Sequence, residues 1–343
     1  MLSRSRCSTS VPIVLALLFL AAPLQAQEQQ FADLGTCALE SGETLEDCRV
    51  GYRTLGTLNG ARDNAILIPT WYRGTGEPWV ERQAVLLGED HGYFVIIIDA
   101  LGNGVSISPS NSEAEPLDAF PQITTRDMVH SQYRLATEVL ELDGVYAVMG
   151  ISMGGMQAFE WAVRYPEFMQ RVIPIAGSPR LAGHDVALWE AYKRLLRWGA
   201  DCQCDAAGEA MMAIGILNAT TSDQAGADLS GSEVLAQIAE GGERRITLGS
   251  ALDGIRQADA MIATDVTHGF DGDWAAAAEA VRARVLIIAG ASDHVVTPRT
   301  GEVFAEFLGE KATSIVFQND CGHNIPGCEI FRARSLIREF LRR

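Results

Sequence analysis

Basic residues are scarce in this chain of 343 residues. Lysine and arginine number 27 against 44 aspartates and glutamates, which gives a formal net charge of −17. Nucleic acids and anionic membrane surfaces would repel such a protein, so neither is an expected partner. Internal repeats and low-complexity tracts are absent too. Because 48% of the residues are hydrophobic, the chain can bury a sizeable core, and its length suits one large domain or a domain with an insertion.

The apolar run near the N-terminus is too short to span a bilayer well. It covers residues 11–22, follows Arg4 and Arg6, and precedes Leu24-Gln25-Ala26. A basic start, a short apolar segment and a small residue at its end are typical of a cleaved signal peptide, the alternative being an uncleaved anchor. We therefore expect residues 1–26 to be removed near Ala26, which leaves an exported protein without a stable membrane span.

Cysteine usage agrees with export. Apart from Cys7, the cysteines form three local pairs: Cys37 and Cys48, Cys202 and Cys204, and Cys321 and Cys328. An oxidising compartment would allow disulfides in these pairs, with Cys37–Cys48 closing a hairpin and Cys202–Cys204 forming a strained ring. The Cys202-x-Cys204 pair has no nearby histidine and lacks the usual CxxC spacing, so no metal site is expected.

Six continuous apolar runs predict strands that are buried on both faces. The runs are "AILIPT" from residue 65, "YFVIIIDALGNG" from 93, "GVYAVMG" from 144, "RVIPIAGSP" from 171, "ARVLIIAGASD" from 283 and "TSIVFQND" from 313. Segments with helical periodicity, such as residues 125–142 and 156–169, lie between them. Buried strands that alternate with helices indicate an α/β protein with a mostly parallel central sheet.

The stretch between Pro179 and Arg282 contains no clear buried strand and has the pattern of helices and loops. An insertion of this length between two strands of one sheet is typical of a helical cap over the edge where α/β sheets bind ligands. We therefore expect a first core segment at 27–180, a cap at 181–281 and a second core segment at 282–343.

Ser152 lies in the sequence Gly150-Ile151-Ser152-Met153-Gly154, a G-x-S-x-G motif. A predicted strand precedes the motif, and an amphipathic helix that begins near Gly155 follows it. In such a sharp strand-to-helix turn the glycines avoid backbone collisions and the serine hydroxyl is lifted above the sheet. The alternative is a small residue at a crowded junction. The context predicts that Ser152 is a nucleophile.

A nucleophilic serine needs a basic histidine and an acid that orients it. With this turn, the expected chain order is serine, acid, histidine. Asp293 follows the predicted strand after the cap, and His323 follows the last predicted strand. The other five histidines precede the serine, lie in the cap or adjoin the acid. We predict a Ser152, Asp293 and His323 triad, with Asp320 as a rival acid.

An oxyanion hole needs two backbone N–H groups. The residue after the nucleophile, Met153, supplies one of them. The loop after an early strand, in "IPTWYRGTG", supplies the other, with Trp71 as the favoured residue and Tyr72 as the neighbouring alternative. Tyr72 and Asn324 are the candidate residues of the substrate pocket.

At Gly150 to Gly154, Asp293 and His323 the chain resembles the α/β-hydrolase superfamily. More narrowly, "MGISMGGMQAFEWAVRYP", "FPQITTRDMVHSQYRLATEVL" and the block at 40–70 resemble the homoserine O-acetyltransferase family, over most of the mature chain outside the cap. The resemblance implies an α/β-hydrolase fold with a helical cap, and acyl transfer through an acyl-serine on the predicted triad. No metal or cofactor is implied.

Two departures concern the substrate. Acetyltransferases of this family carry Gly-His-Asp at the histidine, where the Asp holds an amino group, whereas this chain has Asn324. The family's cap arginine, which grips the substrate carboxylate, has no counterpart in "GEAMMAIGILNATT". Loss of both charged anchors argues against homoserine, and an exported enzyme would meet water rather than acetyl-CoA.

We therefore predict an exported serine hydrolase that cleaves a small ester, lactone or amide. An O-acyltransferase of the homoserine O-acetyltransferase type is the second hypothesis, and a non-catalytic binding protein with this fold is the third. The expected partner is a small acyl substrate, and the sequence leaves a homodimer open.

Overall fold

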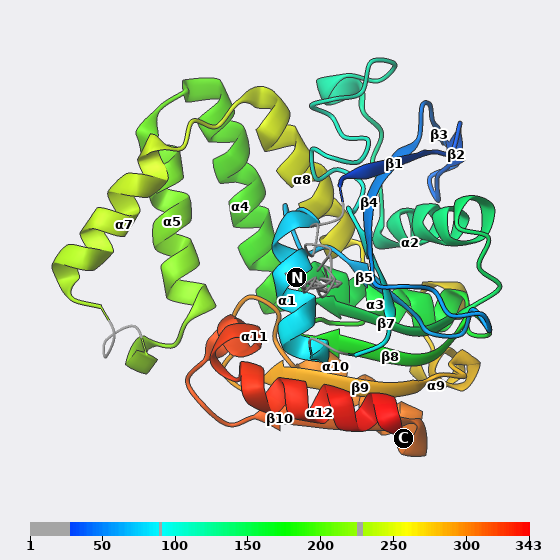
Figure 1. Ribbon diagram of the computed structural model, residues 1–343. Helices are drawn as coiled ribbons and strands as arrows, with labels where there is room; N and C mark the ends of the chain where they lie inside the picture. The colour runs from blue at the N-terminus through cyan, green and yellow to red at the C-terminus, as the bar shows by residue number, and fades with distance from the viewer. Residues whose placement is uncertain (1–27, 89–90, 225–228) are drawn as a thin grey trace, which may run out of the picture.

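An eight-stranded sheet forms the centre of the protein (Figure 1). The computed structural model describes residues 28–88, 91–224 and 229–343, so the predicted signal peptide at 1–26 lies outside the described residues. In spatial order the strands are β1 (Gln30–Asp33), β4 (Arg49–Leu55), β6 (Phe94–Ile98), β5 (Ala65–Pro69), β7 (Val145–Ile151), β8 (Met169–Ile175), β9 (Arg284–Gly290) and β10 (Ala312–Phe317). The pairs β1–β4 and β4–β6 are antiparallel, and all other neighbours are parallel.

The six strands predicted from apolar runs are β5 to β10, and their continuous hydrophobicity follows from burial on both faces. In β5, Ala65 and Leu67 face one core cluster, whereas Ile66 and Ile68 face the other. Because successive side chains of a strand point to opposite faces, a strand covered on both sides needs apolar residues at every position.

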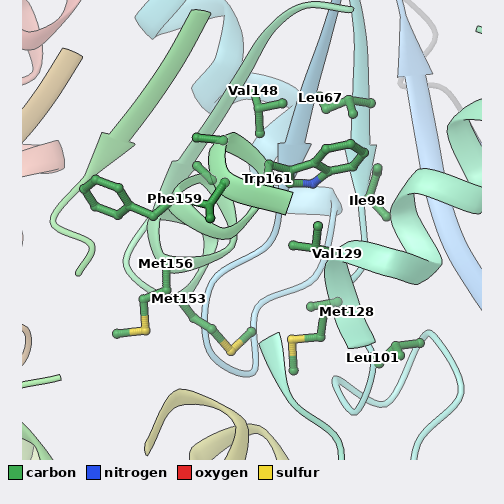
Figure 2. Packing of buried hydrophobic residues seen from close by; sticks show 14 of the residues in the cluster. Leu67, Ile98, Leu101, Met128, Val129, Val148, Met153, Met156, Phe159 and Trp161 are labelled. Atoms are coloured by element: carbon green, nitrogen blue, oxygen red, sulfur yellow. The ribbon is translucent and has the colours of Figure 1, made fainter. Parts of the chain in front are cut away.

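Helices cover both faces of the sheet. One core cluster includes residues of α2 (Thr125–Arg134), α3 (Met153–Arg164), α9 (Trp274–Ala280) and α10 (Arg299–Leu308). The other includes residues of α1 (Glu77–Leu87) and α12 (Ile330–Arg342), which pack together. Figure 2 shows Phe159 and Trp161 of α3 within the first cluster, together with Leu67 of β5. The helix predicted at 125–142 divides into α2 and a π-helical segment, Leu135–Val139.

Four of the described helices between β8 and β9 stand beside the sheet, where Figure 1 shows α5 and α7 farthest from it. They are α4 (Gly183–Cys202), α5 (Asp205–Ala219), α7 (Gly231–Glu243) and α8 (Leu248–Ile262). Helix α4 packs on both α5 and α8, and α5 packs on α7. These helices fall within the stretch at 181–281 for which the sequence predicts a cap.

The structure pairs the cysteines as the sequence suggests: Cys37 with Cys48, Cys202 with Cys204, and Cys321 with Cys328. The first bond joins the ends of a small hairpin, β2 (Cys37–Ala38) and β3 (Thr44–Leu45). The last encloses the short helices η5 (Gly322–Asn324) and α11 (Ile325–Cys328). Three further 3-10 turns are η1 (Leu117–Ala119), η3 (His268–Phe270) and η4 (Gly309–Lys311). Within the described residues, no helix is long and apolar enough to cross a membrane.

Candidate active site

Ser152 alone separates β7 from α3, which begins at Met153, two residues earlier than predicted. Its backbone adopts φ 56° and ψ −123°, a region that residues with a side chain seldom occupy. A Cβ atom at Gly150 would overlap the carbonyl oxygen of Gly154, and one at Gly154 would overlap that of Pro69. The Ser152 N–H donates to the carbonyl of Ile175 at 2.8 Å, which ties the turn to β8. The glycines therefore allow the sharp turn that presents the serine hydroxyl.

His323 lies beside this hydroxyl. Its Nε2 is 3.0 Å from Ser152 Oγ, and its Nδ1 is 2.7 Å from Asp293 Oδ2. These distances are within hydrogen-bond reach for a nucleophile, its base and the orienting acid. The three residues come from the ends of β7, β9 and β10, so the parallel sheet brings them to one edge.

Asp293 is held by its own loop. Its side chain is fully buried, and Oδ1 accepts hydrogen bonds from the N–H groups of Val295 and Val296, both at 2.9 Å. Oδ2 therefore remains for His323. An Nδ1–H that donates to this carboxylate leaves Nε2 as the acceptor, which is the tautomer that can remove a proton from Ser152.

The rival acid Asp320 takes no part in this arrangement. It is exposed, and its backbone carbonyl accepts a hydrogen bond from the Thr221 hydroxyl at 3.0 Å. The remaining histidines, His91, His130, His184, His268 and His294, make no contact with Ser152 among the hydrogen bonds of the described residues. In that same part of the chain, no group of three or more His, Cys, Asp or Glu side chains could hold a metal ion.

The two backbone N–H groups that the sequence predicts for an oxyanion hole, those of Met153 and Trp71, both lack a hydrogen-bond partner within the described residues. Met153 is the first residue of α3, so its N–H has no partner within the helix, and the positive end of the helix dipole lies there. No hydrogen bond among the described residues uses the N–H of Trp71. The preceding carbonyl, that of Thr70, accepts from Gln157 Nε2 at 3.1 Å. Because C=O and N–H of one trans peptide point in opposite directions, this bond fixes the direction of the Trp71 N–H.

A cavity of about 420 Å³ opens above the serine. Its wall comprises Trp71, Tyr72, Arg82, Ile151, Ser152, Trp189, Tyr192, Gly215, Ala219, Val295, His323, Asn324, Pro326 and Gly327. Both pocket residues predicted from the sequence, Tyr72 and Asn324, belong to this wall. Sequence reasoning did not assign Trp189, Tyr192 or Arg82 to the site, because an aromatic residue in a helical insertion or a single arginine in a helix carries no local signal.

The two tyrosines of the wall remain protonated at neutral pH. Burial of its hydroxyl raises the pKa of Tyr72 well above the usual value of a phenol, and burial raises the pKa of Tyr192 to about 12. The Tyr192 hydroxyl donates to the carbonyl of Met211 at 3.3 Å. The cap side of the cavity is therefore aromatic and uncharged.

Comparison with known proteins agrees with this fold. The family model for the alpha/beta hydrolase fold matches residues 65–197. The chain is 41% identical over 161 residues to a protein of Corynebacterium glutamicum named as a probable esterase, which covers 45% of each chain. It is 36% identical over 169 residues to the ethyl acetate hydrolase of Pseudomonas veronii, 47% of each chain. A homoserine O-acetyltransferase of Methanobrevibacter ruminantium is 36% identical over 188 residues, 48% of this chain and 37% of that one.

These alignments span less than half of each relative's length. The structural likeness extends further. An acetylester hydrolase from Corynebacterium glutamicum superposes with a TM-score of 0.82 and 25% identity, over 92% of this chain and 96% of that one.

The protein therefore has the α/β-hydrolase fold, and both the predicted fold and the predicted resemblance to that superfamily are confirmed. The similar proteins include esterases and homoserine O-acetyltransferases. The predicted resemblance to the homoserine O-acetyltransferase family is thereby confirmed as well.

Proposed function

We propose that this protein is an exported serine esterase that hydrolyses small carboxylic esters. The observation that carries the proposal is the continuous set of contacts from Ser152 Oγ through both nitrogens of His323 to the buried Asp293. The cavity above the serine, at about 420 Å³, has the size of a small-molecule site. The esterase names of the similar proteins support the same reaction.

The arrangement gives each residue a step. His323 Nε2 removes the proton of Ser152 while Oγ attacks the ester carbonyl, and Asp293 stabilises the imidazolium that forms. The N–H groups of Met153 and Trp71 bind the oxyanion. The tetrahedral intermediate then expels the alcohol, which takes the proton from His323, and an acyl-serine remains. Water activated by His323 attacks the acyl-serine, the carboxylic acid leaves, and Ser152 regains its proton.

An O-acyltransferase is the second candidate, because homoserine O-acetyltransferases are among the similar proteins. In that reaction an alcohol replaces water in the second step. The neutral Asn324 at the cavity wall favours hydrolysis, since it cannot form an ion pair with an amino-acid acceptor. Lactones and amides remain alternative substrates of the same acyl-serine chemistry.

A panel of short p-nitrophenyl esters, assayed with and without acetyl-CoA plus homoserine, separates these functions. We expect ester turnover in water that acetyl-CoA leaves unchanged, and no O-acetylhomoserine. Acetylhomoserine formation that outpaces hydrolysis would favour the transferase. A protein that hydrolyses none of the esters and does not label with a fluorophosphonate at Ser152 would be the non-catalytic relative.

Export is proposed from residues 1–26 alone. The mature protein recovered from outside the cytoplasm should begin close to Gln27, as intact-mass measurement would show. A cytoplasmic protein that keeps its N-terminal residues would contradict this part of the proposal. The oligomeric state, for which a homodimer is one alternative, stays a prediction.

A further inference from the structure

Among the described residues that line the catalytic cavity, Arg82 is the one that is permanently charged. The residues that line it in the described part of the chain include no aspartate or glutamate, although the whole chain carries a formal net charge of −17. Arg82 lies on α1, between Glu81 and Gln83. A cation that faces a substrate cavity in an acidic protein is a candidate for binding a negative group.

The guanidinium of Arg82 has no carboxylate partner within the described residues. It takes part in no ion pair there, and its Nε is buried without a hydrogen-bond partner. The guanidinium makes a cation–π contact with Trp71, whose ring centroid lies 5.5 Å from the Arg82 Cζ. A cation–π contact uses the face of the guanidinium and leaves the N–H groups in its plane available.

A second unsatisfied donor lies on the cap side of the same cavity. Trp189 of α4 is 5% exposed, and its Nε1 is buried without a partner. Its ring stands edge-on to that of Tyr72, with centroids 4.6 Å apart, and the Tyr72 hydroxyl is also buried without a partner. Each of these three unpartnered polar atoms belongs to a residue of the cavity wall and can donate a hydrogen bond.

We infer that the natural ester substrate carries a second, ionised acid group, a carboxylate, and that Arg82 binds it while Trp189 donates to an uncharged oxygen of the same molecule. This inference rests on the proposed ester hydrolysis. The planar guanidinium matches the two oxygens of a carboxylate. Arg82 thus selects for monoanionic esters, whether the carboxylate belongs to the acyl group or to the alcohol.

Two pairs of nearly isosteric esters test the selection. Monomethyl succinate and methyl levulinate differ by a carboxylate on the acyl side, and acetoxyacetate and acetoxyacetone differ by one on the alcohol side. In at least one pair, the wild-type kcat/KM should favour the anionic ester. Arg82→Gln should lower that anionic-to-neutral ratio about tenfold or more, because a charge-assisted hydrogen bond is lost, and Arg82→Lys should restore part of it.

Arg194→Gln is the matched control. It removes the same charge from a side chain that is 80% exposed on the cap helix α4, away from the cavity wall. It should leave the ratio unchanged. A wild type that prefers the neutral ester in both pairs overturns the inference, as does an equal change of ratio in Arg82→Gln and Arg194→Gln.

Binding to the inactive protein separates this inference from the proposed reaction. Calorimetric titration of monomethyl succinate and of acetoxyacetate into Ser152→Ala, with and without Arg82→Gln, requires no turnover. Weaker binding of either anion after Arg82→Gln supports the carboxylate site even if no ester is hydrolysed. Equal binding to both proteins, or none to either, would contradict it while leaving ester hydrolysis untouched.

Discussion

The carboxylate of Asp293 lies 2.7 Å from Nδ1 of His323, although 30 positions separate the two residues in the chain. Asp320, much nearer to the histidine in sequence, is exposed and meets the cap through its backbone carbonyl instead. The loop after β9, and not the histidine's own loop, therefore places a carboxylate against His323. This relationship favours Asp293 over Asp320 as the proposed acid.

Replacing the acid should impair the base without unfolding the protein. Asp293→Asn keeps the shape of the side chain but favours the wrong tautomer of His323, so kcat should fall by about 10⁴. Asp320→Asn is the control and should stay close to wild type. Steady-state turnover of a p-nitrophenyl ester measures both variants. A large loss in Asp320→Asn with an undiminished rate in Asp293→Asn would move the acid to Asp320.

The Cys321–Cys328 disulfide should matter more for rate than for stability. It encloses the segment that carries His323. A loop this short gains about 2–3 kcal/mol at most from closure, whereas a base displaced by about 1 Å can cost roughly a hundredfold in rate. Cys321→Ser/Cys328→Ser should therefore lower kcat strongly with a small change in Tm.

Cys37→Ser/Cys48→Ser serves as the control, because that disulfide closes a hairpin outside the cavity wall. It should affect Tm and spare kcat. Mass spectrometry of the unreduced wild type completes the test. Alkylation of both Cys321 and Cys328 in the native oxidised protein would rule out the bond.

Gln157 should act as a positioning residue for the oxyanion hole. Its Nε2 donates to the carbonyls of Thr70 and Met153, both at 3.1 Å, and its Oε1 accepts from Gln132. Gln157→Leu frees the peptide that carries the Trp71 N–H, so kcat should fall roughly tenfold or more. This loss should be smaller than the roughly 10²–10³-fold loss of kcat that follows removal of an oxyanion donor itself. KM should change little, because the lost interaction belongs to the transition state.

Gln132→Leu is the matched control for Gln157→Leu. It breaks the same buried network, in which Gln132 also accepts from Trp161 Nε1 at 2.8 Å, but it leaves the bond to Thr70 in place. Both variants should lose thermal stability, and only Gln157→Leu should lose most of its kcat. Equal losses of kcat in the two would show that Gln157 contributes to stability alone.

Glu160 on α3 should make the fold less stable as the pH rises. Burial raises its pKa to about 7 from the ordinary 4.5, against the opposing effect of Arg126 and Arg164 and with a smaller contribution from Glu40 and Asp265. The folded state then keeps a proton that the unfolded chain releases. The contribution of protonated Glu160 to the free energy of unfolding is complete below about pH 4.5. It is lost as the pH rises towards 7, by about 3 kcal/mol at most.

Thermal unfolding from about pH 5 to about pH 8 tests this linkage. Glu160→Gln cannot release a proton, so its Tm should fall less over this range than that of the wild type. Glu167→Gln, at a side chain that is 85% exposed, is the control and should follow the wild type. The same pH dependence in Glu160→Gln and the wild type would contradict the raised pKa.

The central strands and the candidate catalytic positions could be predicted from the sequence because each depends on a local pattern. Residues 65–69 are apolar at every position because both faces of β5 are buried, and Ser152 stands between glycines that the turn requires. The two antiparallel strands β1 and β4 were missed, since a strand such as β1, with alternating exposed residues, lacks a continuous apolar run.

The pocket could be predicted only in part, because its wall depends on how distant elements meet. Arg82 reaches the cavity from α1 and Trp189 reaches it from α4, and neither helix has a motif that points to the serine. Tyr72 and Asn324 were predicted because they adjoin Trp71 and His323 in sequence. The other residues of the cavity wall are brought together by tertiary packing, which single-sequence patterns do not encode.

The most direct test of the account is the identification of the acyl-enzyme. Rapid quenching with p-nitrophenyl acetate, followed by peptide mass spectrometry, should place one acetyl group on Ser152 in the wild type and none on the corresponding peptide of Ser152→Ala. The same variant should lose several orders of magnitude in turnover while keeping its Tm, because the acyl-serine cannot form. Near-normal turnover by Ser152→Ala, or stoichiometric acetylation at another residue, would contradict the proposed mechanism.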